Sequence, residues 1–318
     1  MVPSDFAGIF SRYFVIGFFL PVFFALVLVA HLIYLSSTPY DYSSASGATQ
    51  IVILGGAGLL GGLLLLGVNQ YVVRIFAGYP LKGLITSLAR RMDPKGRPVE
   101  YVLWPISRNL AKKLLLEEEA EREGEGANDP EKTEAALKVN QRFPSQDHEI
   151  MPTKLGNAIR AFQSYPYKTY GLDGPPNWSR VEALVTENEK EALAEALTTF
   201  AFWLNLIVLT AAATIYIWVA DVLGRPHSTG STALLTLVSA TAGALVAWGA
   251  YCASVGAAIN WGASVRAAYD LHRLELYERL GLKRPRTEEE EEEIARAANR
   301  SASFGEKPTA AVRNTSGS

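Results

Sequence analysis

The stretch Ile51-Val-Ile-Leu-Gly-Gly-Ala-Gly-Leu-Leu-Gly-Gly-Leu-Leu-Leu-Leu-Gly-Val-Asn-Gln-Tyr-Val-Val73 decides the fold class. It carries no charged residue and exceeds the roughly 20 apolar residues that a helix needs to cross a hydrocarbon core. Gly56, Gly58 and Gly61 also match the G-x-G-x-x-G spacing of dinucleotide-binding turns. That interpretation fails, because the following residues are wholly apolar and no acidic residue appears before Asp93. The stretch therefore predicts a membrane helix.

Three more stretches have the same character, at residues 13–35, 200–220 and 232–256. Residues 13–35 are too long an apolar run for the roughly 7–15 residues of a secretory signal, so we expect a retained span, bent at Pro21. Only 19% of all residues are charged, against about a quarter in soluble domains. The sequence predicts an all-α membrane protein with four transmembrane helices and a mostly helical cytoplasmic region.

The distribution of Lys and Arg predicts the orientation. The connection at residues 36–50 has neither, and residues 221–231 have only Arg225. Residues 74–199 carry 18 Lys and Arg, and another ten follow the fourth stretch. Because cytoplasmic segments are enriched in Lys and Arg, both termini are expected in the cytoplasm.

This topology divides the chain into five segments. They are a transmembrane hairpin at 1–73, a cytoplasmic domain at 74–199, a second hairpin at 200–265, a helical extension at 266–300 and a disordered tail at 301–318.

Composition also predicts the helices outside the spans. In the cytoplasmic domain we expect helices at 109–123 and 131–140, separated by a flexible loop at 124–130. We expect a continuous helix from residue 181 into the third span, and the fourth span extending to Gly281. Thr287 is expected to cap the helix of the final extension.

Small residues at helical spacing indicate close helix packing. Gly58 and Gly62 form a G-x-x-x-G pair, while Gly243 and Gly249 lie on adjacent faces of the fourth span. A helix with two such faces favours contacts between subunits, so we expect a homo-oligomer in the lipid bilayer.

The four spans contain no charged residue, which disfavours proton-coupled transport. Four amides, Asn69, Gln70, Asn205 and Asn260, lie toward the cytoplasmic ends of the apolar stretches. They could hydrogen-bond between helices, or they could surround the inner mouth of an apolar pore.

A run dense in aromatic residues and turns occupies residues 151–180, where Pro166 is expected to end a short helix. It forms either a partner-binding surface or an amphipathic elbow at the membrane interface. The candidate partner surface consists of Arg160, Tyr167, Tyr170, Asp173, Trp178 and Arg180.

Two motifs carry a resemblance. They are the aromatic stretch Arg12-Tyr-Phe-Val-Ile-Gly-Phe-Phe-Leu-Pro21 and the element Pro152-Thr-x-Leu-Gly-Asn157 … Tyr170-Gly-Leu-Asp173 … Trp178-x-Arg180. With this layout the chain resembles uncharacterised bacterial multi-span membrane proteins. The resemblance implies the bacterial cytoplasmic membrane and no catalytic residue.

No pattern of a catalytic, metal or cofactor site is present. The chain has one Cys and four His without metal-ligand spacing, and it lacks the common nucleophile and phosphate-loop motifs. Residues 74–199 hold 19 acidic and 18 basic residues, which argues against nucleic-acid binding. The sequence thus favours a non-enzymatic oligomeric channel gated by its cytoplasmic region. The alternatives are a non-conducting scaffold or signal-sensing component that recruits a cytoplasmic partner and, third, a lipid-acting enzyme.

Overall fold

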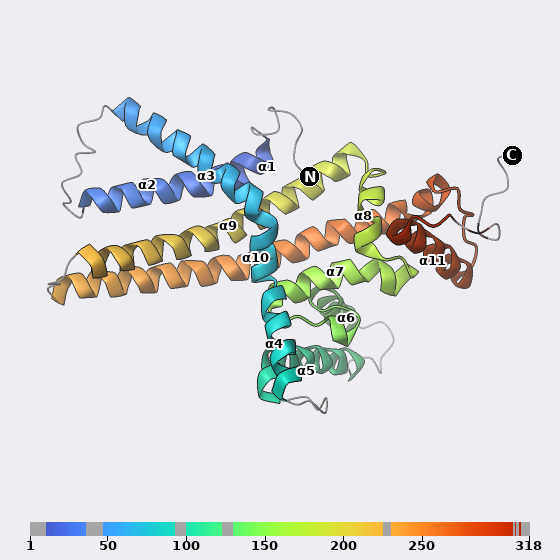
Figure 1. Ribbon diagram of the computed structural model, residues 1–318. Helices are drawn as coiled ribbons and strands as arrows, with labels where there is room; N and C mark the ends of the chain where they lie inside the picture. The colour runs from blue at the N-terminus through green and yellow to red at the C-terminus, as the bar shows by residue number, and fades with distance from the viewer. Residues whose placement is uncertain are drawn as a thin grey trace. The chain divides into compact units, whose positions relative to one another are not determined.

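All regular structure in the described part of the chain is helical (Figure 1). The structure, a computed structural model, describes residues 11–35, 47–92, 100–122, 130–224, 230–307, 309 and 312. The elements are α1 (Arg12–Phe14), a π turn (Val15–Phe19), α2 (Leu20–Leu35), α3 (Gly47–Phe76), α4 (Tyr79–Met92), α5 (Glu100–Arg122), α6 (Pro130–Arg142), a 3₁₀ turn (Asp147–Glu149), α7 (Lys154–Tyr170), α8 (Gly174–Glu182), α9 (Glu187–Gly224), α10 (Gly230–Arg279) and α11 (Glu288–Phe304).

The chain divides into two compact units. The first takes Met1–Val73 and Ala194–Ala257, and the second takes Arg74–Leu193 and Ala258–Ser318. Among the described residues, three helical segments are long and apolar enough to cross a membrane, at Gly47–Phe76, Glu187–Tyr216 and Leu237–Arg279. The prediction of an all-helical protein with membrane-spanning helices is confirmed to this extent, and the glycine-rich stretch lies within α3 as expected.

In the first unit, glycines allow close approach of helices. A Cβ added to Gly58 would lie 3.2 Å from Phe19 Cε2, and one added to Gly62 would lie 3.1 Å from Phe14 Cζ. On α10, a Cβ at Gly243 would overlap the hydroxyl of Thr214. Gly249 differs, because no described atom beyond the adjoining part of its own helix lies within 4 Å of its Cβ position. Three of the four predicted packing glycines therefore lie at helix contacts within one chain.

The helix that begins the first unit contains a proline whose lost hydrogen bond is compensated by another helix. Pro21 has no N–H to donate to the carbonyl of Gly17, four residues earlier, and the π turn ends two residues before the proline. Asn205 Nδ2 of α9 donates to the Gly17 carbonyl at 2.7 Å. A Cβ added to Gly17 would lie 3.4 Å from Ala201 Cβ, an ordinary contact distance, so the two helices are close at this point. The fully buried Asn205 thus joins α9 to the first helix.

Replacing Asn205 by Leu should destabilise the first unit by about 1–2 kcal/mol, because the Gly17 carbonyl would lose a buried donor. Unfolding in mixed detergent micelles, followed by tryptophan fluorescence, measures this loss. The matched change of the exposed Asn260 to Leu should cost less than about 0.5 kcal/mol. Equal stabilities of the two variants would contradict a structural role for the Asn205 amide.

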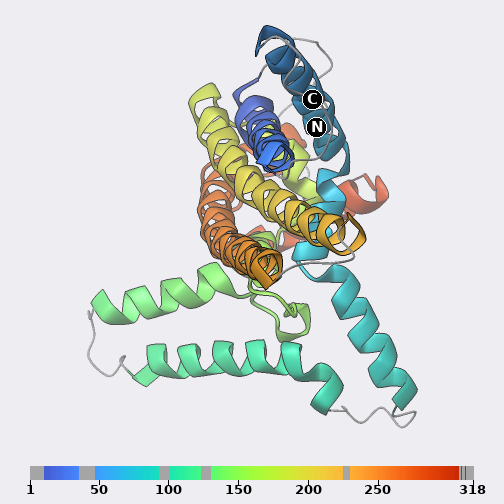
Figure 2. The same ribbon diagram turned by 90° about the vertical axis from the view of Figure 1, so that its left-hand side faces the viewer.

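The helices of the second unit differ in places from those expected. α5 begins nine residues before position 109, at Glu100, and α6 matches its expected range closely. The two lie side by side (Figure 2). Most of the expected loop at 124–130 lies outside the described residues.

The expectation that Pro166 ends a helix is wrong, since α7 continues to Tyr170. Pro166 is buried, and its ring lies against the start of α8, with Cγ 3.4 Å from the Cβ position of Gly174. This tertiary packing outweighs the one lost backbone bond. The helix ends instead at Gly171, whose φ of +68° suits glycine and whose N–H donates to the Tyr167 carbonyl.

α9 does not begin at residue 181, because a turn separates it from α8. Its true start carries a capping signal, in which Glu189 accepts hydrogen bonds from the N–H and the hydroxyl of Thr186 at 2.8 and 2.7 Å. α10 is continuous to Arg279, as predicted. The Thr287 cap is confirmed by its hydrogen bond from the Glu290 N–H, and α11 runs to Phe304, into the segment expected to be disordered.

Candidate functional site

The first half of the 151–180 run forms the start of α7 and the contacts that hold this helix against Ala77 and Met151. Thr153 caps the helix by accepting from the Gly156 N–H at 3.0 Å. Gly156 lies directly against the Ala77 carbonyl, where a Cβ could not be placed. The buried Asn157 accepts from the Met151 N–H at 2.7 Å and donates to the Met151 carbonyl at 3.0 Å. These residues have a structural role in the second unit.

The second half of the run packs against α10 and α11. Tyr170 donates its hydroxyl to Asp270 at 2.8 Å, and the Arg273 guanidinium lies 3.9 Å from the centre of its ring. Trp178 lies against Tyr269, and Arg180 donates to the Ser301 carbonyl at 3.3 Å. Three of the six candidate surface residues, Tyr170, Trp178 and Arg180, therefore make contacts inside the unit.

Asn299 of α11 completes this junction and was not singled out from the sequence. Its Oδ1 accepts from the Asp173 N–H at 2.8 Å and from Asn177 Nδ2 at 3.1 Å, and its Nδ2 donates to the Gly171 carbonyl at 2.9 Å. A lone Asn in a polar helix gives no sequence signal of such contacts.

The other three candidates, Arg160, Tyr167 and Asp173, line one open cleft of about 630 Å³. This α7 cleft lies between the turn that follows α6, the outer face of α7 and the start of α8. Its lining consists of Ser145, Gln146, Glu149, Arg160, Gln163, Ser164, Tyr167, Lys168, Asp173, Gly174, Pro175 and Pro176. Three of the twelve lining residues were thus among the six candidates named from the sequence.

The cleft combines charges of both signs with an exposed aromatic ring. Arg160 lies 3.9 Å from Glu149 and 5.3 Å from the centre of the Tyr79 ring. Tyr167 is 49% exposed, and the neighbouring Lys168 donates to Asn140 at 3.1 Å. Burial raises the pKa of Asp173 above its ordinary value. An exposed ring flanked by polar groups suits recognition of a polypeptide segment.

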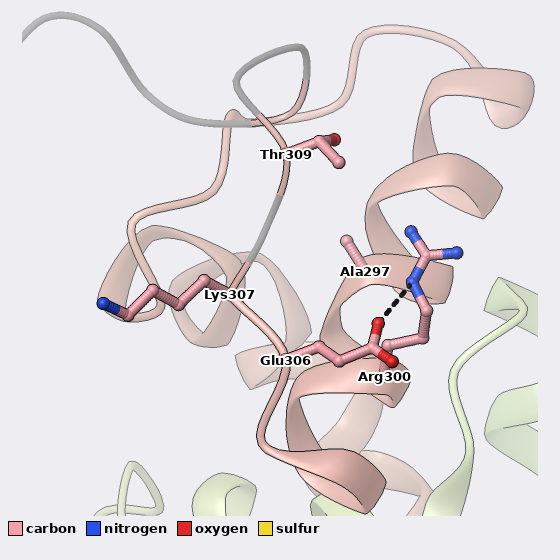
Figure 3. Close-up of a pocket in the computed structure, with 5 residues that line it drawn as sticks. All are labelled: Ala297, Arg300, Glu306, Lys307 and Thr309. Carbon is pink, nitrogen blue, oxygen red and sulfur yellow. Dashed lines mark ion pairs between the residues drawn. The ribbon is translucent and has the colours of Figure 1, made fainter.

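A smaller cavity of about 330 Å³ lies at the end of α11 (Figure 3). Arg300 Nε faces Glu306 Oε2 across it at 3.6 Å, and both side chains are more than half exposed. Because such a pair is well solvated, this cavity does not indicate a binding site.

The four amides do not share one environment. Asn205 bonds to Gly17, Gln70 is exposed, and the buried Oδ1 of Asn69 has no partner in the described part of the chain. Asn260 belongs to the second unit and is exposed.

Among the described residues, no group of three or more His, Cys, Asp or Glu side chains is placed to hold a metal ion. Comparisons with protein-family models, with curated proteins and with solved structures find no match to this chain.

Proposed function

We propose that this protein is a membrane-anchored adaptor that recruits a cytoplasmic protein through the α7 cleft. In this proposal four helices cross the bacterial cytoplasmic membrane, with both termini in the cytoplasm. The fourth crossing is the apolar helix that includes Arg12–Val27 and continues to Leu35. The concentration of Lys and Arg in residues 74–199 supports the orientation.

The α7 cleft is the observation that carries the proposal. Tyr167 is about half exposed, and it lines the cleft together with Pro175 and Pro176. Rigid aromatic side chains are favoured anchors in protein interfaces. Next to the cleft, Tyr170 and Trp178 pack against α10 and Arg180 hydrogen-bonds to α11, so the walls formed by α7 and α8 are held by tertiary contacts.

Replacing Tyr167 by a photo-crosslinking amino acid in living cells should give a discrete adduct with one protein. The purified partner should then bind the detergent-solubilised protein, and Tyr167→Ala should weaken binding at least about tenfold. The matched control is Phe304→Ala, which removes an aromatic side chain that is 76% exposed outside the cleft. Equal weakening by both substitutions, or none by Tyr167→Ala, would argue against the cleft.

A pore is the second candidate function, favoured by the buried and unpartnered Oδ1 of Asn69 among the described residues. The open face at Gly249 supports the homo-oligomer that such a pore needs. The hydrogen bond from Asn205 to the Gly17 carbonyl supports the alternative to a pore, in which the amides join helices by hydrogen bonds. Ion flux through reconstituted liposomes separates the functions. Under the adaptor proposal, liposomes stay tight even after truncation behind Gly281, whereas a pore gives flux that Asn69→Leu reduces.

A further inference from the structure

A third cavity in the second unit lies between α6, α7 and α10 and has a volume of about 360 Å³. Its polar lining comes chiefly from Asn140, Tyr165, Lys168, Arg266 and Asp270. Unlike the α7 cleft, this Arg266 cavity contains a charged side chain that is almost completely buried, with an exposed fraction of 9%. Burying a cation is costly unless it is paired or fully hydrogen-bonded.

Arg266 is only partly satisfied by the protein. Its Nε donates to the Gly262 carbonyl at 3.3 Å and its Nη1 to the Asn140 carbonyl at 3.2 Å. Its Nη2 is buried and has no hydrogen-bond partner in the described part of the chain. The guanidinium carbon lies 5.7 Å from the centre of the Tyr165 ring, which shields one side of the group. One donor of this charged group is therefore left unsatisfied by the described part of the chain.

The nearby carboxylate of Asp270 does not neutralise Arg266 by contact. Asp270 Oδ1 accepts hydrogen bonds from the hydroxyls of Tyr165 at 2.9 Å and of Tyr170 at 2.8 Å. Within the described residues, no ion pair joins Arg266 to this carboxylate. Lys168 adds a second cation at the rim, where its ammonium donates to Asn140. With two cations and one carboxylate, the cavity has an excess of positive charge.

We propose that the Arg266 cavity binds a phosphate group, held by Arg266 and Lys168. A guanidinium and an ammonium converging on one cavity match the charge and the acceptor oxygens of phosphate. The group can belong to inorganic phosphate or to an anionic phospholipid. Arg266 is the first charged residue after the uncharged residues 228–265, so it stands where the apolar part of α10 ends. Basic pockets at that position in a helix suit lipid headgroups.

The test uses the full-length protein in detergent, with inorganic phosphate as one probe and phosphatidylglycerol as the other. Isothermal titration calorimetry measures phosphate binding, and native mass spectrometry counts retained lipid, with phosphatidylcholine as the zwitterionic reference. We expect saturable binding of at least one anionic probe. Binding of inorganic phosphate supports a free-phosphate site, whereas preference for phosphatidylglycerol without phosphate binding supports a headgroup site.

Arg266→Gln locates the binding, because Arg266 lines this cavity and not the α7 cleft, and Lys168→Gln tests the second cation, which lines both. Arg266→Gln should abolish it, and Lys168→Gln should weaken it about tenfold by removing one charged hydrogen bond. Because Lys168 is exposed, its replacement leaves the fold intact even if Arg266→Gln unfolds the unit. The matched control is Lys154→Gln, an exposed lysine on the same helix outside the cavity. No binding of either probe, or equal weakening by Lys168→Gln and Lys154→Gln, would overturn the phosphate site and leave the α7 cleft proposal untouched.

Discussion

Replacing Gly156 by Ala is expected to destabilise the second unit by about 3 kcal/mol, at the upper end of the cost of overpacking. The added methyl group would overlap the Ala77 carbonyl and lie 2.8 Å from Met151 Cβ. Neither neighbour is the flexible end of a long side chain, so the backbone itself must move. Thermal unfolding of the detergent-solubilised protein, followed by circular dichroism, should show a transition at clearly lower temperature.

Gly83→Ala is the matched control for this prediction. Gly83 lies within α4 with nothing within 4 Å of its Cβ position. The same substitution should there stabilise the helix by about 0.5–1 kcal/mol, because alanine has the higher helix propensity. A Gly156→Ala protein as stable as Gly83→Ala would show that the contact between α7 and Ala77 does not exist in solution.

The second large effect is expected for Asn157→Leu, at about 3 kcal/mol. Leucine has a similar volume but cannot hydrogen-bond, so the N–H and the carbonyl of Met151 would both lose their bonds to the Asn157 side chain. Met151 is 1% exposed, and water cannot replace these partners without opening the structure. Asn109 also donates to the Met151 carbonyl, at 2.9 Å, so this carbonyl keeps one partner. The larger part of the cost therefore comes from the Met151 N–H, which loses its hydrogen bond to Asn157.

Chemical unfolding compared with Asn188→Leu measures this effect. Asn188 is exposed in the first turn of α9, and its replacement should change stability by less than about 0.5 kcal/mol. If Asn157→Leu and Asn188→Leu unfold at the same denaturant concentration, the prediction is wrong.

Periodicity and charge were sufficient to predict the helical class, because an uncharged run of this length has few other stable structures. The same information could not separate a structural motif from a binding surface. Tyr170, Trp178 and Arg180 have the residue types of a recognition site, yet they contact α10 and α11, which lie about a hundred residues away in the sequence. Such pairings depend on tertiary packing, for which a single sequence carries no local signal.

Local signals succeeded where the interaction itself is local. Thr287 and Glu290 predict the cap of α11, and the Thr186–Glu189 pair is a signal of the same kind at the start of α9. The continuation of α7 through Pro166 could not be predicted, since it depends on a glycine of α8 that packs against the proline ring.

The hydrogen bond between Asn205 and the Gly17 carbonyl joins residues that are 188 positions apart. Because a chain is made from its N-terminus, the first helix is complete long before α9, and the Gly17 carbonyl lacks this donor until residue 205 has been made. This bond therefore forms late, and it couples the N-terminal helix to the second half of the first unit.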